Sequence, residues 1–367
     1  MFSPVRRDSC LLFMTMKHML DELHRLMDKI NRPLKLMEVC GTHTVEIFRH
    51  GIRDVIPKSL TLLSGPGCPV CVTSVRDVDA AISIARNPGV ILATFGDMMR
   101  VPGGEGSLLE ARSEGADVRV LYSPIDALTL AQKWPEKEVV FFATGFETTS
   151  PLIAGTIAHA ESAGTKNFTI FAAHKLVPPA LKALLDSSDV QVDGFILPGH
   201  VSTIIGTRPY EFVASQYKKP SVVTGFAAGE IIEGILMIVR QIAEKRAEIE
   251  IQYTSVVRPE GNPRAVALLE KYFEPADAYW RGIGVIPGSG LKLKDRYAAF
   301  DANIKFHPPI SDAKEPELCS CGDILRGVKI PTECALFGTG CTPDNPIGPC
   351  MVSTEGSCAA YFKYGQH

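Results

Sequence analysis

Short apolar runs rich in β-branched residues recur between residues 35 and 225, and this repetition limits the possible folds of the chain more than any other feature. The runs stand roughly 20–30 residues apart, and amphipathic helical patterns such as VDAAISIARN and PALKALLDSS fill the gaps. Continuous apolar strands that alternate with helices are typical of βαβ units and a buried parallel sheet. The runs are LKLMEVCG, LTLLSGPG, VILATFGD, VRVLYSP, VVFFATGF, FTIFAAHK, GFILPGH and SVVTGFAAG.

Two architectures are compatible with about eight such units. They either close into a TIM barrel or divide into two open four-stranded domains, and periodicity does not distinguish the two because both repeat the same unit. After residue 250 the alternation stops, and WRGIGVIPGSGLKLKDRYAAFDA predicts a hairpin followed by irregular chain. From Cys319 onward the chain is rich in Cys, Gly and Pro and has little apolar periodicity, so we expect a metal centre to hold it together.

Composition narrows the class of protein further. A length of 367 residues predicts about two or three domains, and 46% apolar with 22% charged residues is ordinary for a globular chain. A net charge of −3 gives no general attraction to nucleic acid or to anionic lipid. No apolar run reaches the ~18 residues of a membrane helix. The N-terminus has a twin arginine and a short apolar patch without a cleavage site, so we expect a cytoplasmic protein without a targeting peptide.

The ten cysteines fall into two groups with none between Cys71 and Cys319. Structural disulfides are disfavoured in a reducing cytosol, so clustered cysteines predict metal ligands or redox groups. The N-terminal group comprises Cys10, Cys40, Cys68 and Cys71, and the C-terminal group comprises Cys319, Cys321, Cys334, Cys341, Cys350 and Cys358.

The N-terminal cysteines follow two predicted strands. Cys40 comes after LKLMEV, and Cys68 and Cys71 lie in GPGCPVC after LTLLS. If the strands are neighbours they lie ~5 Å apart, and the three thiols meet at the edge of the sheet where ligands bind. The following helix, SVRDVDAAISIA, would point its N-terminus at the CPVC pair and lower a thiol pKa. The pair is therefore a redox dithiol, part of a metal site, or two buried small apolar residues.

His43 stands three residues after Cys40, within one helical turn if a helix begins there. It is a candidate metal ligand or proton donor, and the alternative is a capping and packing residue.

Four C-terminal cysteines have a distinctive spacing, with twelve, six and sixteen residues between Cys321, Cys334, Cys341 and Cys358. Four thiolates in a loop-rich segment suit a structural zinc or an iron–sulfur cluster. The absence of paired C-x-x-C knuckles favours the cluster. Spacing alone leaves Cys319 and Cys350 ambiguous.

Three glycine-rich stretches are less specific. VPGGEGS, residues 101–107, superficially suggests a phosphate loop, but it lacks the lysine and the strand–loop–helix placement. GFETTSP and PGHVSTIIG follow strands in the second half of the repeat region. Glu147, Thr148, Thr149 and His200 in these stretches either line a cleft between domains or cap helices.

Several motifs together resemble the HypD family of nickel–iron hydrogenase maturation factors. They are MEVCGTHT, GPGCPVCV, TFGDMMRVPG, GFETT, PGHVS and the C-x12-C-x6-C-x16-C run ending EGSCAA, and they cover nearly the whole chain. The resemblance implies an α/β fold of two similar parallel-sheet domains facing a cleft, plus a C-terminal loop-rich iron–sulfur domain, in place of a TIM barrel. On this basis we expect a helical segment at 1–34, α/β domains at 35–133 and 134–250, and the cluster domain at 251–367.

The resemblance also implies cofactors and roles for individual cysteines. Cys40 would hold the iron that receives two cyanides and one carbon monoxide, and Cys68 and Cys71 are further candidate iron ligands. Cys10, Cys319 and Cys350 receive no role from it. The 4Fe-4S cluster would be bound by Cys321, Cys334, Cys341 and Cys358.

Two partners follow from the same resemblance. A small HypC-type chaperone would supply a further thiolate to the iron, and a HypE-type protein would deliver cyanide as a thiocyanate on its C-terminal cysteine. Releasing cyanide from a thiocyanate takes two electrons, because the products are a thiol and cyanide. A Cys68/Cys71 dithiol can store that pair and a nearby cluster can refill it one electron at a time, so we expect the cluster close to CPVC.

Two other functions fit parts of the pattern. A general iron–sulfur-dependent disulfide reductase would need neither Cys40 nor His43 beside the dithiol. A structural zinc protein would bind its metal through Cys40, His43, Cys68 and Cys71.

Overall fold

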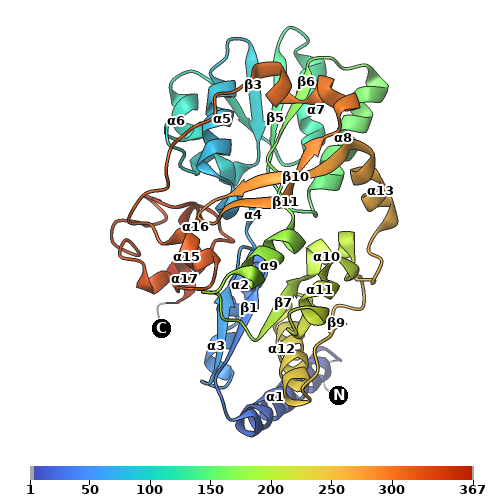
Figure 1. Ribbon diagram of the computed structural model, residues 1–367, viewed down its shortest axis with the longest axis vertical. Helices are drawn as coiled ribbons and strands as arrows, with labels where there is room; N and C mark the ends of the chain where they lie inside the picture. The colour runs from blue at the N-terminus through green and yellow to red at the C-terminus, as the bar shows by residue number, and fades with distance from the viewer. Residues whose placement is uncertain (1–3, 366–367) are drawn as a thin grey trace.

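The computed structural model describes residues 4–365, with side chains described for residues 15–365. The chain forms two parallel sheets, one with the strand order β2-β1-β7-β8-β9 and one with the order β4-β3-β5-β6. Figure 1 shows the four-stranded unit above the five-stranded unit, with the C-terminal segment beside their junction. The predicted α/β class with two parallel sheets and a cysteine-rich C-terminal region is confirmed, and no barrel closes.

The five-stranded unit is built from both ends of the repeat region. Its sheet contains β1 (Leu34–Glu38), β2 (Leu60–Ser64), β7 (Gly194–Pro198), β8 (Ser221–Thr224) and β9 (Ile249–Ile251). Apolar side chains of its strands and of the long helices α1 and α12 form one core, because both helices bury an apolar stripe. Its helices are α1 (Pro4–Ile30), α2 (Gly41–Arg49), α3 (Ile52–Val55), α9 (Val177–Asp186), α10 (Gly199–Ile205), α11 (Glu211–Ser215) and α12 (Ala228–Ala243).

The four-stranded unit is continuous in sequence. Its strands are β3 (Val90–Thr94), β4 (Asp117–Val120), β5 (Glu138–Ala143) and β6 (Phe168–Ala172), and every residue of β3 is buried, as expected for a central parallel strand. Its helices are α5 (Val75–Ala85), α6 (Leu108–Ser113), α7 (Pro124–Lys133) and α8 (Ser150–Ala163).

The sheet pairing differs from the division predicted at residues 133/134. That position lies between β4 and β5, and β3 is hydrogen-bonded to both. The chain enters the four-stranded unit after β2 and returns to the five-stranded sheet at β7, which pairs with β1. The pattern of apolar runs does not reveal this exchange, because strands of the two sheets have the same composition and length.

The C-terminal third forms the predicted hairpin and a loop-rich segment. After α13 (Pro263–Tyr272), strands β10 (Phe273–Trp280) and β11 (Gly284–Leu293) pair antiparallel, and Figure 1 shows the hairpin crossing between the two units. The elements that follow are short: η3 (Asp295–Phe300), α14 (Ala302–Phe306), α15 (Cys321–Leu325), η4 (Pro331–Glu333), α16 (Pro349–Val352) and α17 (Ser357–Tyr364).

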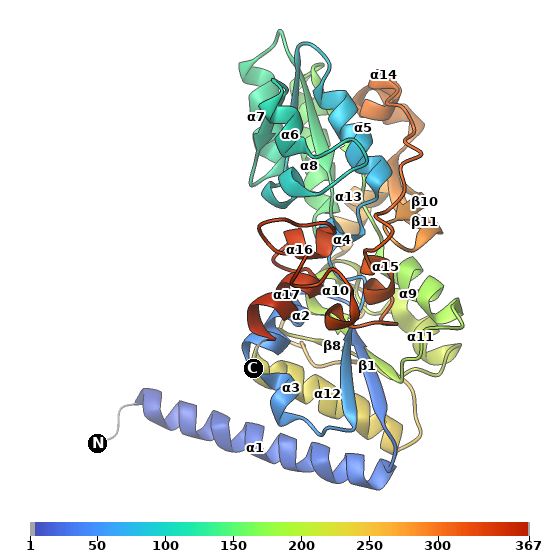
Figure 2. The same ribbon diagram turned by 90° about the vertical axis from the view of Figure 1, so that its left-hand side faces the viewer.

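Figure 2 places α15, α16 and α17 side by side at the junction of the two units. Within residues 4–365 no helix is both long and apolar enough to cross a membrane. The side chain of Cys10 lies outside the described residues.

Candidate functional site

Cys40 lies where β1 ends and α2 begins, and it is the N-cap residue of α2. β1 and β2 are neighbours, as predicted, with Leu36 opposite Leu62, and the Gly41 nitrogen donates to the Gly67 oxygen at 2.9 Å, so Cys40 and the CPVC loop follow adjacent strand ends. The residues that line the cleft include Cys40 but neither Cys68 nor Cys71. Gly67 makes this close approach possible, because a Cβ at that position would lie 2.2 Å from the Cys40 nitrogen. Burial, and then the negative charge of Glu355, raise the pKa of Cys40 to about 12.

Cys68 and Cys71 form a disulfide with a Cα–Cα distance of 5.2 Å. Cys68 is the N-cap of the short helix α4 (Pro69–Val72), and its Sγ accepts a hydrogen bond from the Cys71 nitrogen at 3.2 Å. The pair lies on a short helix of its own, and the helix SVRDVDAAISIA begins only after it. Ser74 caps that helix, α5, by accepting a hydrogen bond from the Asp77 nitrogen, because Thr73 and Ser74 separate the two helices.

A cavity of about 410 Å³ separates the two units at this edge. The predicted cleft residues Thr148, Thr149 and His200 line it together with Cys40. The complete lining is Val39, Cys40, Thr42, Gly67, Pro69, Phe146, Thr148, Thr149, Pro198, His200, Val201, Thr203, Ile204 and Glu355. The cleft therefore combines one thiol, one carboxylate, one imidazole and several hydroxyls with apolar walls.

His43 does not line the cavity, although it follows Cys40 closely in the sequence. Its side chain is fully buried, with Nε2 at 2.9 Å from Thr224 Oγ1 and 3.0 Å from the Gly225 oxygen. Its ring stacks on Phe226, which also stacks on the His200 ring. Burial lowers the pKa of His43 to about 4, so the imidazole is neutral and supports the wall of the cleft from behind.

Glu147 also lies beneath the surface of the cleft. Its side chain is buried, and Oε1 accepts a hydrogen bond from the Val177 nitrogen at 2.9 Å, at the start of α9. Burial raises the pKa of Glu147 to about 7. Of the two predicted roles of Glu147, the structure shows the capping of a helix, because its carboxylate accepts from the first residue of α9, whereas its neighbours Phe146 and Thr148 line the cavity.

All six C-terminal cysteines line one apolar pocket. Two of them, Cys321 and Cys350, have their Sγ atoms 2.8 Å apart. Burial acts to raise the pKa of Cys334, but N–H groups of Ser320 and Leu336 donate to its sulfur and hold that pKa below the ordinary value. The lining is Cys319, Cys321, Ile324, Cys334, Leu336, Phe337, Cys341, Gly348, Cys350, Met351 and Cys358.

The donor set of this pocket suits an iron–sulfur cluster. Thiolates with N–H···S hydrogen bonds in an apolar shell are the usual environment of such a cluster, and the Ile347 nitrogen donates to Cys341 Sγ at 3.3 Å. Among the described residues, no group of three or more His, Cys, Asp or Glu side chains has the geometry to hold a single metal ion. The site predicted for zinc is not assembled either, since Cys68 is bonded to Cys71 and His43 is buried elsewhere.

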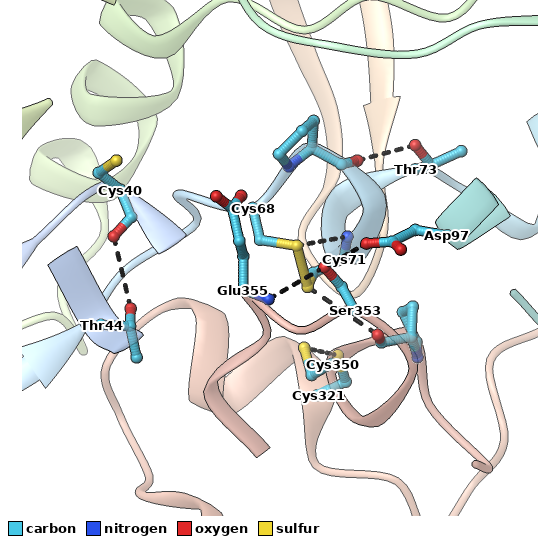
Figure 3. Close-up of a disulfide and its surroundings, with 12 residues drawn as sticks. Cys40, Thr44, Cys68, Cys71, Thr73, Asp97, Cys321, Cys350, Ser353 and Glu355 are labelled. Carbon is cyan, nitrogen blue, oxygen red and sulfur yellow. Dashed lines mark hydrogen bonds between the residues drawn. A yellow bond between two sulfur atoms is a disulfide. The ribbon is translucent and has the colours of Figure 1, made fainter. Parts of the chain in front are cut away.

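The two sulfur groups are adjacent, as predicted. Cys71 Sγ lies 3.9 Å from the oxygen of Pro349, the residue before Cys350. Figure 3 shows Cys321 and Cys350 directly beside the disulfide, and Cys40 on its other side. The CPVC segment and the C-terminal cysteine segment therefore lie in direct contact in this structure.

The C-terminal segment also reaches the cleft through residues 353–355. Thr42 Oγ1 donates to Glu355 Oε1 at 2.8 Å in the five-stranded unit. Ser353 Oγ donates to Asp97 Oδ2 at 3.1 Å, and Asp97 belongs to η1 (Gly96–Arg100) of the other unit. The loop thus contacts both units beside the disulfide (Figure 3).

Sequence reasoning missed Thr42, Thr203 and Glu355 as cleft residues. Glu355 packs so closely on Gly41 that a Cβ there would lie 2.6 Å from the Glu355 Cβ. Its only signal in the sequence is its place in the EGSC motif, three residues before Cys358. The glycine-rich loop 101–107 proves structural, because the buried carboxylate of Asp79 accepts its N–H groups.

Fold and site together define a two-unit α/β protein with a buried thiol in its cleft and a cysteine-rich segment packed against a disulfide. The family model described as "HypD: Hydrogenase formation hypA family" matches residues 14–365, and the chain belongs to the HypD family of hydrogenase maturation factors. It is 49% identical to hydrogenase maturation factor HypD2 of Bradyrhizobium diazoefficiens over 343 residues, covering 91% of this chain and 90% of the relative.

Two other relatives give the same result. Hydrogenase maturation factor HypD of Azotobacter vinelandii is 49% identical over 342 residues, which cover 91% of this chain and 90% of the relative. The corresponding factor of Rhodobacter capsulatus is 46% identical over 358 residues, which cover 95% of both chains.

Proposed function

We propose that this chain is a scaffold with redox activity that assembles the Fe(CN)2CO centre of nickel–iron hydrogenases. Iron, the cargo, is held by Cys40 in the cleft between the two units. The observation that carries the proposal is the proximity of the sulfur-bearing segments. The Gly41 nitrogen, next to Cys40, donates to the oxygen of Gly67, next to Cys68, at 2.9 Å, and the Cys68–Cys71 disulfide contacts the segment of six cysteines through Pro349.

The cleft residues supply binding and positioning. Burial and Glu355 keep Cys40 protonated in the absence of metal, so iron binding displaces the thiol proton. Hydroxyl groups of Thr148 and Thr149 face the same cavity and can donate hydrogen bonds to cyanide nitrogens. Phe146 provides an apolar surface beside them.

Cys68 and Cys71 handle the electron pair. When the dithiol closes to the disulfide it releases two electrons and two protons. A protein thiocyanate takes up two electrons and one proton and yields a thiol and cyanide, which leaves one proton to be released. We propose that a HypE-type donor presents the thiocyanate and that a HypC-type chaperone contributes a second thiolate to the iron.

The pocket of C-terminal cysteines would hold a 4Fe-4S cluster, which when bound supplies single electrons. Cys334, Cys341 and Cys358 are proposed ligands, and the family motif gives Cys321 as the fourth. The Cys321 sulfur lies 2.8 Å from the Cys350 sulfur and is therefore already paired with a neighbouring thiol. This pairing supports Cys319 as the alternative fourth ligand. Visible absorption of Cys319→Ala and Cys321→Ala proteins decides between them, since only loss of the true ligand abolishes the cluster bands.

The proposal as a whole is tested by infrared spectroscopy of protein purified anaerobically with a HypC-type partner. We expect cyanide and carbonyl bands that disappear in Cys40→Ala while the cluster absorption stays. Cys10→Ala, outside every family motif, is the matched control and should keep both signals. Full-intensity bands in Cys40→Ala would place the iron elsewhere. A general reductase would act without Cys40, and a zinc protein would contain zinc by metal analysis and lack visible absorption.

A further inference from the structure

The tip of the β10–β11 hairpin lies between the two sulfur groups. Trp280 forms a β-bridge with Thr73, and the Arg281 nitrogen donates to the Val72 oxygen at 2.9 Å, so one side of the tip is fastened to the CPVC helix. On the other side Gly282 is so close to Gly322 that a Cβ on Gly282 would lie 2.4 Å from the Gly322 Cα. Gly322 directly follows Cys321, so the tip contacts both cysteine-bearing segments.

Arg281 carries a buried positive charge at this tip. Its side chain is only 1% exposed, whereas that of its ion-pair partner Glu315 is 30% exposed. Arg281 Nε donates to Glu315 Oε2 at 2.7 Å, and Nη1 donates to the Pro102 oxygen at 2.8 Å. Arg281 lines a cavity of about 180 Å³ together with Cys319 and Cys321. Its charge acts electrostatically on both Cys321 and Cys350.

A fixed guanidinium at this place affects redox chemistry. Reduction adds negative charge to a cluster, and a nearby buried cation stabilises the reduced state. Arginine suits this task because it stays charged when buried. Glu315 weakens the effect, because its carboxylate opposes the guanidinium field and is itself partly screened by water.

We propose that Arg281 is a positioning residue that sets the reduction potential of the C-terminal sulfur centre, and that Glu315 attenuates its effect. The proposal rests on the redox role given above, in which electrons pass from this centre to Cys68 and Cys71. It assigns a purpose to the hairpin, which brings one charge to the junction of both sulfur groups.

The test is an anaerobic spectroelectrochemical titration of the full-length, cluster-containing protein. Arg281→Met should favour the oxidised state at least tenfold, which lowers a one-electron midpoint potential by about 59 mV. Glu315→Gln should shift the potential in the opposite direction, and Arg281→Lys should remain near the unsubstituted protein. The control is Arg240→Met, which breaks the ion pair with Glu22 between α12 and α1 and should leave the potential unchanged.

Several results would overturn the proposal. Shifts of equal sign in Arg281→Met and Glu315→Gln contradict a charge effect. If Arg281→Met fails to fold, the absence of a shift in Glu315→Gln contradicts it. A potential in Arg281→Lys that matches Arg281→Met shows that Arg281 acts through packing alone. Absence of cyanide bands in protein with an intact cluster would refute the assembly function, but the potentials of the Arg281 and Glu315 variants would still test the present proposal.

If no cluster forms in any variant, the readout is the Cys68–Cys71 couple, measured by thiol trapping in graded redox buffers. Because formation of the dithiol takes up two protons and adds no net charge, Arg281→Met should leave this couple within about 30 mV of the unsubstituted protein, and a larger shift contradicts a charge effect confined to the C-terminal centre.

Discussion

The burial of His43 predicts a specific acid sensitivity of folding. Its imidazole is enclosed by Thr224, Gly225 and Phe226, and burial lowers its pKa from 6.5 to about 4. Between these values the unfolded chain binds a proton at this position that the folded chain excludes. The contribution of a neutral His43 to stability is therefore complete above pH 6.5 and declines as the pH falls toward 4.

The magnitude follows from the two pKa values. Proton linkage with values of 6.5 unfolded and about 4 folded gives a loss of about 2 kcal/mol in unfolding free energy between pH 7 and pH 5. His174 is also buried, and its lowered pKa adds acid sensitivity, whereas the raised pKa of buried Glu147 acts in the opposite direction. Only the difference between the unsubstituted protein and a His43 variant isolates the effect of His43.

The assay is urea unfolding at pH 7 and pH 5, with unfolding free energies taken from midpoints and slopes. His43→Gln retains a polar side chain for Thr224 and Gly225 but does not titrate, so its loss between the two pH values should be smaller by about 2 kcal/mol. His18→Gln, at an exposed position of α1, is the control and should behave like the unsubstituted protein. Equal losses in His43→Gln and the unsubstituted protein would refute a buried, neutral His43 and reopen its role as a proton donor or ligand in the cleft.

Three further predictions concern the sulfur sites. Gly67→Ala should lower the free energy of unfolding by about 3 kcal/mol, because the added Cβ would meet the backbone of Cys40. The control is Gly96→Ala, whose Cβ would meet only a Val120 methyl group at 3.5 Å and should be tolerated. Thermal unfolding of the two variants measures the difference. Cys334→Ala should abolish the visible cluster absorption and raise the protease sensitivity of the C-terminal segment, and an unchanged spectrum would remove Cys334 from the ligands. Thiol trapping in graded redox buffers should show a two-electron transition that requires both Cys68 and Cys71; a transition that survives either single substitution would contradict their pairing.

The sequence predicted elements better than connections. Apolar runs located the strands because a central parallel strand is buried on both faces and tolerates few polar residues, as in β3. The passage of the chain from one sheet to the other was not predictable. β2 and β3 belong to different sheets, yet the connection between them is the same kind of βα unit that joins strands within one sheet.

The sequence predicted those parts of the site whose residues directly follow neighbouring strands. Cys40 and the CPVC loop follow paired strands, so their meeting is a consequence of parallel pairing. His43 and Glu147 take the alternative roles of packing and helix capping, and the sequence left the choice open because one position along a turn or helix decides between the cleft and the core. Glu355 and Arg281 were missed because long-range packing alone brings them to the sulfur groups, through Gly41 and the hairpin tip.

The C-terminal cysteine segment also shapes the cleft around Cys40. Residues 319–358 bury little core of their own, so their order depends on the thiolate-bound cluster proposed above. The same segment supplies Glu355 to the cleft, and Ser353 joins it to Asp97 of the other unit. Loss of the cluster should therefore release Glu355 from Thr42 and lower the pKa of the Cys40 thiol, because both burial and the carboxylate that raise it would diminish. In the proposed function, electron supply and iron binding would be coupled through this one loop, and such a coupling would explain why one chain contains both sulfur groups.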